Sequence, residues 1–161
     1  MASTLWHKRV LKTEGALNIL QCLPEAHAQF CLLRQCLSAC RVNDLLRSTP
    51  IDWAVPECAR LQVALRHHLD GILGYPTTAV QWQQSALAVR CGGLGVADPV
   101  MLRPAARLAC TVHFLQHVQS VLGFSADLNI VPRDVSITLP LLQTQLGDIQ
   151  FIRKWVSELR E

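Results

Sequence analysis

The chain has 161 residues, half of them hydrophobic and only 17% charged, so it is long enough and apolar enough to bury a core. This composition excludes an intrinsically disordered tail, which combines few apolar residues with many charges. The net charge of +3 and the pI near 8.6 permit binding to nucleic acid without requiring it.

The N-terminal stretch and the cysteines predict an intracellular protein. In residues 1–9 the basic side chains follow the apolar ones and no apolar h-region occurs, so we expect no secretory signal. No apolar run reaches the roughly 20 residues of a membrane span, and we expect no membrane contact. The seven cysteines, an odd number, lie mostly in apolar helical stretches and predict small core residues rather than a disulfide framework. We therefore expect a protein of the cytoplasm or nucleus.

Helical periodicity dominates the first third of the chain. A basic lead-in precedes a helix expected over residues 13–22. A second helix is expected to begin at Pro24 and Glu25, which suit a helix N-terminus and its dipole. Its apolar stripe comprises Ala26, Phe30, Leu33 and Leu37. Residues 38–41 should bend this helix, and the chain should leave it before Pro50, because the residue preceding a proline avoids the α region.

Two further helices are expected on either side of a loop that follows Gly74. Asp52 is the expected N-cap of the first of them, with Pro56 in its first turn. Its apolar stripe comprises Leu61, Leu65, Leu69 and Ile72. Thr77 or Thr78 is expected to cap the second helix, which should run to about residue 89. Its expected inward side chains are Val80, Trp82 and Leu87.

Three of the eight glycines, Gly92, Gly93 and Gly95, fall within four positions between helical stretches. Glycine allows a positive φ or a close backbone approach there. The pattern Gly-x-Gly-x-x-Asp puts Asp98 where a dinucleotide fingerprint needs its third glycine, and it follows a helix rather than a strand. It therefore predicts a structural joint between two helical halves, not a phosphate cradle.

Asp98 and Pro99 predict a strong helix start, an N-cap followed by proline at the first helical position. The apolar stripe of this helix comprises Met101, Ala105, Leu108, Val112, Leu115 and Leu122. Pro104 predicts a kink or a short separate first turn, and Gly123 is the expected C-cap.

The remaining residues predict at most one short strand, at 134–139, and a final amphipathic helix that begins at Asp148. Together the elements predict a mainly α fold. We expect one domain over residues 1–161, an irregular bundle of about six helices.

Two groups of side chains are candidates for contact with nucleic acid. The first would lie within about 80° on one face of an unbroken helix, and it comprises Arg103, Arg107, Phe114 and His117. Arginines beside an aromatic ring are typical of single-strand-binding surfaces. The second group comprises Arg34, Arg41 and Arg47. The open alternatives are a helix buried on two sides for the first group and a solvated face for the second.

Cys110, His113 and His117 share one helix face and are weak candidates for zinc ligands. A structural zinc site needs four ligands, and no C-x-x-C motif supplies the others, so we expect no metal and no cofactor. The sequence has no Asp-Asp dipeptide, and its acidic residues are scattered singly. No two-metal site or acid/base pair can be assembled locally, so we expect no catalytic residue and no enzyme activity.

Four motifs occur in a fixed order between residues 20 and 118. They are LPEAHAQFCLLRQCL at 23–37, LLRSTP at 45–50, Gln81-Trp82 with VRCGGLGV at 89–96, and PAARLAC at 104–110. This order resembles the region downstream of the polymerase core in reverse transcriptases of non-LTR retrotransposons. The family pattern differs at Ile51, where it has a second proline, and residues 119–161 are not covered.

The resemblance implies a detached helical module from the thumb side of an RNA-directed DNA polymerase, which would help to hold the template–primer duplex. The family's Tyr/Phe-x-Asp-Asp box does not occur in the sequence, so no catalytic residue is carried over. The implied partners are RNA, DNA or a polymerase core. The competing hypothesis is a protein-interaction or scaffold domain with no nucleic-acid role, with a homodimer as one form.

Overall fold

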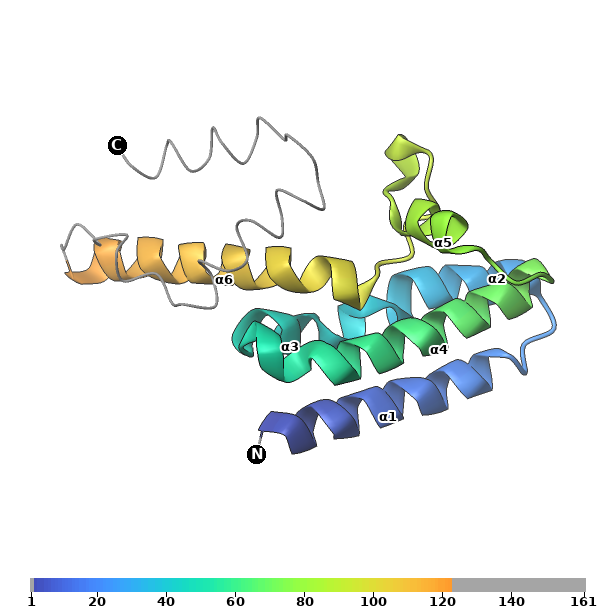
Figure 1. Cartoon of the computed structure of the whole chain (residues 1–161), viewed down its shortest axis with the longest axis horizontal. Helices are drawn as coiled ribbons and strands as arrows, with labels where there is room; N and C mark the ends of the chain where they lie inside the picture. Colours follow the sequence, from blue (N-terminus) through green and yellow to red (C-terminus); the bar gives the residue numbers. More distant parts are fainter. Residues whose placement is uncertain (1, 123–161) are drawn as a thin grey trace.

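Helices make up most of residues 2–122, the part of the chain that this computed structural model describes (Figure 1). The α-helices are α1 (Ala2–Leu20), α2 (Ala26–Leu32), α3 (Asn43–Ser48), α4 (Val55–Leu73), α5 (Ala79–Ala86) and α6 (Pro99–Leu122). A π-turn, η1 (Leu33–Leu37), and three 3-10 turns, η2 (Ala39–Val42), η3 (Ile51–Ala54) and η4 (Val89–Cys91), connect them.

No strand occurs among these described residues, and the expected mainly α bundle is confirmed. The expected strand at 134–139, the cap at Gly123 and the final helix lie outside the described residues. None of the described helices combines the length and the hydropathy that crossing a bilayer requires.

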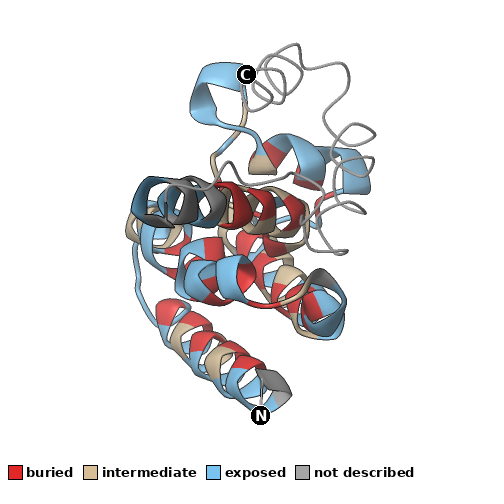
Figure 2. Ribbon diagram, turned by 90° about the vertical axis from the view of Figure 1, so that its left-hand side faces the viewer, coloured by how far each residue is buried: buried red, intermediate tan, exposed pale blue. Residues whose placement is uncertain are grey.

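Periodic apolar side chains pack α1 against α4, which lie side by side in Figure 1. The fully buried core residues of these two helices are Trp6, Val10 and Leu17 on α1 and Cys58, Leu61, Leu65 and Leu69 on α4. Figure 2 shows the buried residues gathered on the inner faces of the helices. Because Trp6 and Val10 extend the apolar stripe toward the N-terminus, α1 begins at Ala2 rather than at residue 13, and the basic lead-in is helical.

The expected bend at residues 38–41 is confirmed. Ser38 leaves the helical region with ψ of −156°, and its hydroxyl donates to the Arg34 carbonyl at 2.9 Å. The chain then enters η2 and α3. Thr49 is extended before Pro50 and ends α3, as expected. The Trp6 indole donates to the Thr49 hydroxyl at 3.1 Å, which ties α1 to the end of α3.

Apart from the early start of α1, the helix ends differ from the expected ones at two places. Asp52 is not an N-cap, because η3 leads directly into α4 and Ala54 occupies the cap position; Pro56 does lie in the first turn. Thr78 caps α5 in a capping box with Gln81. That helix ends at Ala86, short of residue 89. Two side chains expected to face inward are instead exposed, Val80 and Leu87.

Helix α6 runs continuously from Pro99 and packs against α3 and α4. Its N-cap is Asp98, whose Oδ1 accepts the backbone N–H of Val100 at 2.8 Å, as expected. Pro104 lies buried inside the helix, and no separate first turn forms. The buried side chains of its middle turns include Leu108 and Val112 from the expected stripe.

Candidate nucleic-acid interface at the glycine joint

The glycine-rich segment forms a tight loop between α5 and α6. Gly92 and Gly95 have positive φ angles of 78° and 71°, in the left-handed region that favours glycine. Gly93 has no room for a side chain, because a Cβ there would overlap the carbonyl oxygen of Leu87 and lie 2.6 Å from that of Gln84. All three glycines therefore occupy positions where another residue would strain the backbone.

Backbone hydrogen bonds return this loop to the end of α5. The Ser85 carbonyl accepts the N–H groups of Leu94 at 3.2 Å and Val96 at 3.1 Å, and the Leu87 carbonyl accepts that of Gly95 at 2.9 Å. These bonds end α5 at Ala86 and place the Val96 side chain, fully buried, in the core. The joint is accordingly a fixed loop anchored to both flanking helices.

Asp98 fastens the joint to three helices. The carboxylate is 2% exposed, and its Oδ2 accepts the Trp82 indole N–H at 2.8 Å and the Gln62 amide at 2.6 Å. Its Oδ1 caps α6 through Val100, where the N-terminal end of the helix dipole favours a negative charge. Both oxygens are thus occupied by neutral donors from α4, α5 and α6, so Asp98 has a structural role.

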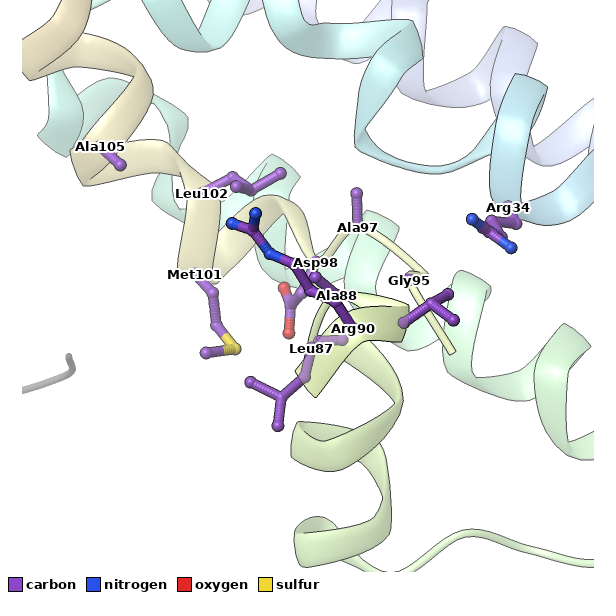
Figure 3. Close-up of a pocket in the computed structure, with 12 residues that line it drawn as sticks. Arg34, Leu87, Ala88, Arg90, Gly95, Ala97, Asp98, Met101, Leu102 and Ala105 are labelled. Carbon is purple, nitrogen blue, oxygen red and sulfur yellow. The ribbon is translucent and has the colours of Figure 1, made fainter. Parts of the chain in front are cut away.

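A cavity of about 640 Å³ opens between the joint, η1 and the first turns of α6 (Figure 3). Most of its walls are apolar side chains, among them Leu87, Val89, Met101 and Leu102. Arg34 and Arg90 are its two cationic residues. In Figure 3 they lie on different sides of Gly95, and Arg90 extends toward α6. The Nε of Arg34 lies 3.1 Å from the place that a Cβ on Gly95 would take, so glycine lets the arginine approach the loop.

Four exposed arginines of the described residues have no ion-pair partner there: Arg34, Arg41, Arg47 and Arg90. Other arginines are paired. Arg9 lies 3.2 Å from Asp44, and Arg60 donates two hydrogen bonds to Glu14 at 2.6 and 2.7 Å. The hydrogen bond to Glu14 raises the pKa of Arg60 above its ordinary value. The structure therefore leaves the second group expected from the sequence, together with Arg90, available to an anionic ligand.

The first expected group does not form one exposed surface. Arg103 is partly buried, its Nε has no hydrogen-bond partner among the described residues, and its charge acts on Cys58 of α4. Arg107 is also partly buried, and its Nη1 donates to the Arg47 carbonyl at 3.2 Å. Phe114 and His117 are exposed. The group is therefore divided between two partly buried arginines and two exposed side chains.

The weak zinc candidates are not assembled into a site. Within residues 2–122, no group of three or more His, Cys, Asp or Glu side chains is placed to hold a metal ion. Cys110 is partly buried, whereas His113 and His117 are exposed. All seven cysteines are free thiols. Burial raises the pKa of the Cys58 thiol to about 11, although the nearby Arg103 charge acts in the opposite direction.

Arg90 is the residue of the cavity that the sequence does not single out as a binding residue. The feature of the sequence that could have identified Arg90 is its position two residues before the glycine joint. Its place in space depends on how the joint folds. Arg34 lies far from it along the chain, so only the tertiary structure brings both to one cavity.

The sequence matches no protein-family model, no curated protein and no solved structure. The resemblance to reverse transcriptases therefore stays a prediction that depends on the four motifs. Any functional interpretation has to combine those motifs with the geometry of the site.

Proposed function

We propose that this chain is a helical module that binds the phosphate backbone of RNA or DNA, related to the thumb side of non-LTR reverse transcriptases and without catalysis of its own. The observation that carries the proposal is the set of four exposed arginines without an ion-pair partner within residues 2–122, two of which line one cavity. Arginine binds phosphate through two parallel N–H groups and keeps its charge at every physiological pH.

The positions of these arginines support binding to a backbone rather than to base pairs. Arg34 lies on η1 and Arg90 on η4, and the bonded glycine loop stands between them. Contacts to phosphate fix the orientation of a nucleic acid and carry no sequence information directly. We therefore expect binding that tolerates any sequence and weakens steeply with salt.

A protein-interaction or scaffold domain is the second candidate, and exposed apolar side chains favour it. The most exposed of these on α1, α4 and α5 are Ile19, Val63 and Val80. Such residues support contact with a partner or a second copy of the chain. Light scattering tests this candidate: a stable homodimer without affinity for nucleic acid would replace the first proposal.

The direct test reverses the two cavity charges with Arg34→Glu and Arg90→Glu together. Fluorescence anisotropy measures the affinity for labelled single-stranded RNA and DNA and for a hybrid duplex, from about 50 to 200 mM salt. Each phosphate contact contributes a slope of about −0.7 for single strands and about −0.9 for duplex DNA to log K against log salt. The slope of the variant should be shallower by about 1.4 to 1.8, with weaker binding throughout.

The matched control makes the same change of net charge with Lys8→Glu and Lys12→Glu. Both lysines are exposed on α1, which lies on the side of α4 away from α5 (Figure 1). The control should retain most of the affinity. Equal losses in the two double variants would mean that net charge alone drives binding, and a wild-type chain without salt-dependent binding would refute the proposal.

A further inference from the structure

The cavity at the glycine joint has the size and the lining of a small-ligand site. Its volume of about 640 Å³ falls within the roughly 300–1,000 Å³ of ligand-binding pockets. The apolar side chains come from two segments that make up its walls, the end of α5 with the joint that follows it and the first turns of α6. An apolar group of ligand size is compatible with this lining.

The charges of the lining select an anion. Asp98 is the acidic residue of the lining, and its two oxygens are engaged by Trp82, Gln62 and Val100 inside the protein. Among the described residues, no ion pair engages the guanidinium group of Arg34 or Arg90. A ligand that suits the cavity therefore combines negative charge with an apolar face.

We infer that the cavity seats one nucleotide of a single-stranded RNA or DNA, an assignment that rests on the proposed function. Arg34 and Arg90 bind the flanking phosphates, and the base lies against Leu87, Met101 and Leu102. A base inside a duplex is paired and stacked and would have to be extruded first, whereas a single strand presents its bases freely.

The same lining makes this site tolerant of base identity. Apart from the two arginines and Asp98, the side chains of the lining are apolar. The Asp98 carboxylate already accepts hydrogen bonds from Trp82 and Gln62, so no side chain of this remainder distinguishes the edges of different bases. Apolar contact with the face of a base is open to all bases, because each has a π-face. The base therefore adds affinity but little sequence preference.

The experiment compares a labelled oligothymidylate with an abasic oligonucleotide of the same length, which has the same phosphates and no bases. Wild-type protein should bind the thymidine strand at least about fivefold more tightly at constant salt. The variant Ala88→Leu with Ala105→Leu narrows the cavity from both walls without adding an aromatic ring. It should lose this preference and keep its affinity for the abasic strand.

The matched control is Ala59→Leu with Ala79→Leu, which places the same side chains at exposed positions outside the cavity. It should retain the preference. Circular dichroism verifies that each variant folds, and the single variants Ala88→Leu and Ala105→Leu replace the double variant if it does not; each should reduce the preference.

Three results would overturn the inference, and they differ from one another. If the wild type binds the thymidine strand and the abasic strand equally tightly, the cavity does not hold a base, and only binding to the backbone remains. No binding of either strand would overturn the proposed function as well. Binding of an acidic, leucine-containing peptide that the narrowed cavity abolishes, with no preference for bases, would assign the cavity to a protein partner.

Discussion

Replacing Gly93 by alanine should destabilise the whole bundle, although it adds a single methyl group. The new Cβ would overlap the Leu87 carbonyl and lie 2.6 Å from the Gln84 carbonyl oxygen, and both are backbone atoms that cannot rotate away. The loop would have to shift, which weakens the hydrogen bonds that place the buried Val96 in the core. Overpacking of this kind costs about 1–3 kcal/mol, and we expect the upper half of that range.

The assay is urea unfolding followed by circular dichroism, with Gly15→Ala as the matched control. Gly15 lies within α1, and a Cβ there meets no atom within 4 Å. Alanine favours the helix over glycine, so the control should gain about 0.5–1 kcal/mol. The reasoning is refuted if Gly93→Ala unfolds at the same urea concentration as the wild type, or if both substitutions shift stability in the same direction.

Two further predictions concern buried polar groups. Asp98→Asn should lower the free energy of unfolding by about 1.5–3 kcal/mol in the same assay. An asparagine amide has a single acceptor oxygen, so it cannot replace both Oδ2, which accepts from Trp82 and Gln62, and Oδ1, which accepts from Val100. A variant as stable as the wild type would contradict this. Cys58, with its pKa raised to about 11, should resist alkylation at pH 8. Because the unfolded chain deprotonates first, stability should fall between about pH 9 and 11 more steeply in wild type than in Cys58→Ala; identical profiles would contradict the linkage.

The sequence predicts this fold best where the cause of a structural feature is local. The break at Ser38, the stop before Pro50, the cap at Thr78 and the start at Pro99 each depend on residues within a few positions. Short-range hydrogen bonds and fixed φ angles act the same way in many folds. The bundle class follows from those boundaries and from the apolar stripes between them.

The features that the sequence misses depend on distant partners. The early start of α1 depends on Trp6, whose indole reaches the hydroxyl of Thr49 at the end of α3. The early end of α5 depends on how the Gly93 backbone packs onto the Leu87 carbonyl. In both cases the deciding contact lies beyond the range of helical periodicity.

The candidate binding residues also divide into those that the sequence can place and those that it cannot. A helical wheel correctly puts Arg103 and Arg107 near one face of α6, but it cannot show that α3 and α4 cover part of that face. It also cannot show that Arg34 meets the loop at Gly95, or that Arg90 shares its cavity. Which arginines remain exposed and unpaired is a tertiary property.

The joint links stability to the proposed binding, because the atoms that hold the loop also set the positions of the two cavity arginines. The Ala97 carbonyl in the joint accepts the backbone N–H of Ala39 at 3.2 Å, which fastens the loop to the turn that follows η1. Arg34 belongs to η1 and Arg90 to η4, which leads directly into the joint, so this bond and the close approach at Gly95 constrain the distance between them. A site of this kind is organised before its ligand arrives, and preorganisation lowers the entropic cost of binding. In the proposed function, the glycines would therefore act through the positions of the arginines, without any side-chain contact to the ligand.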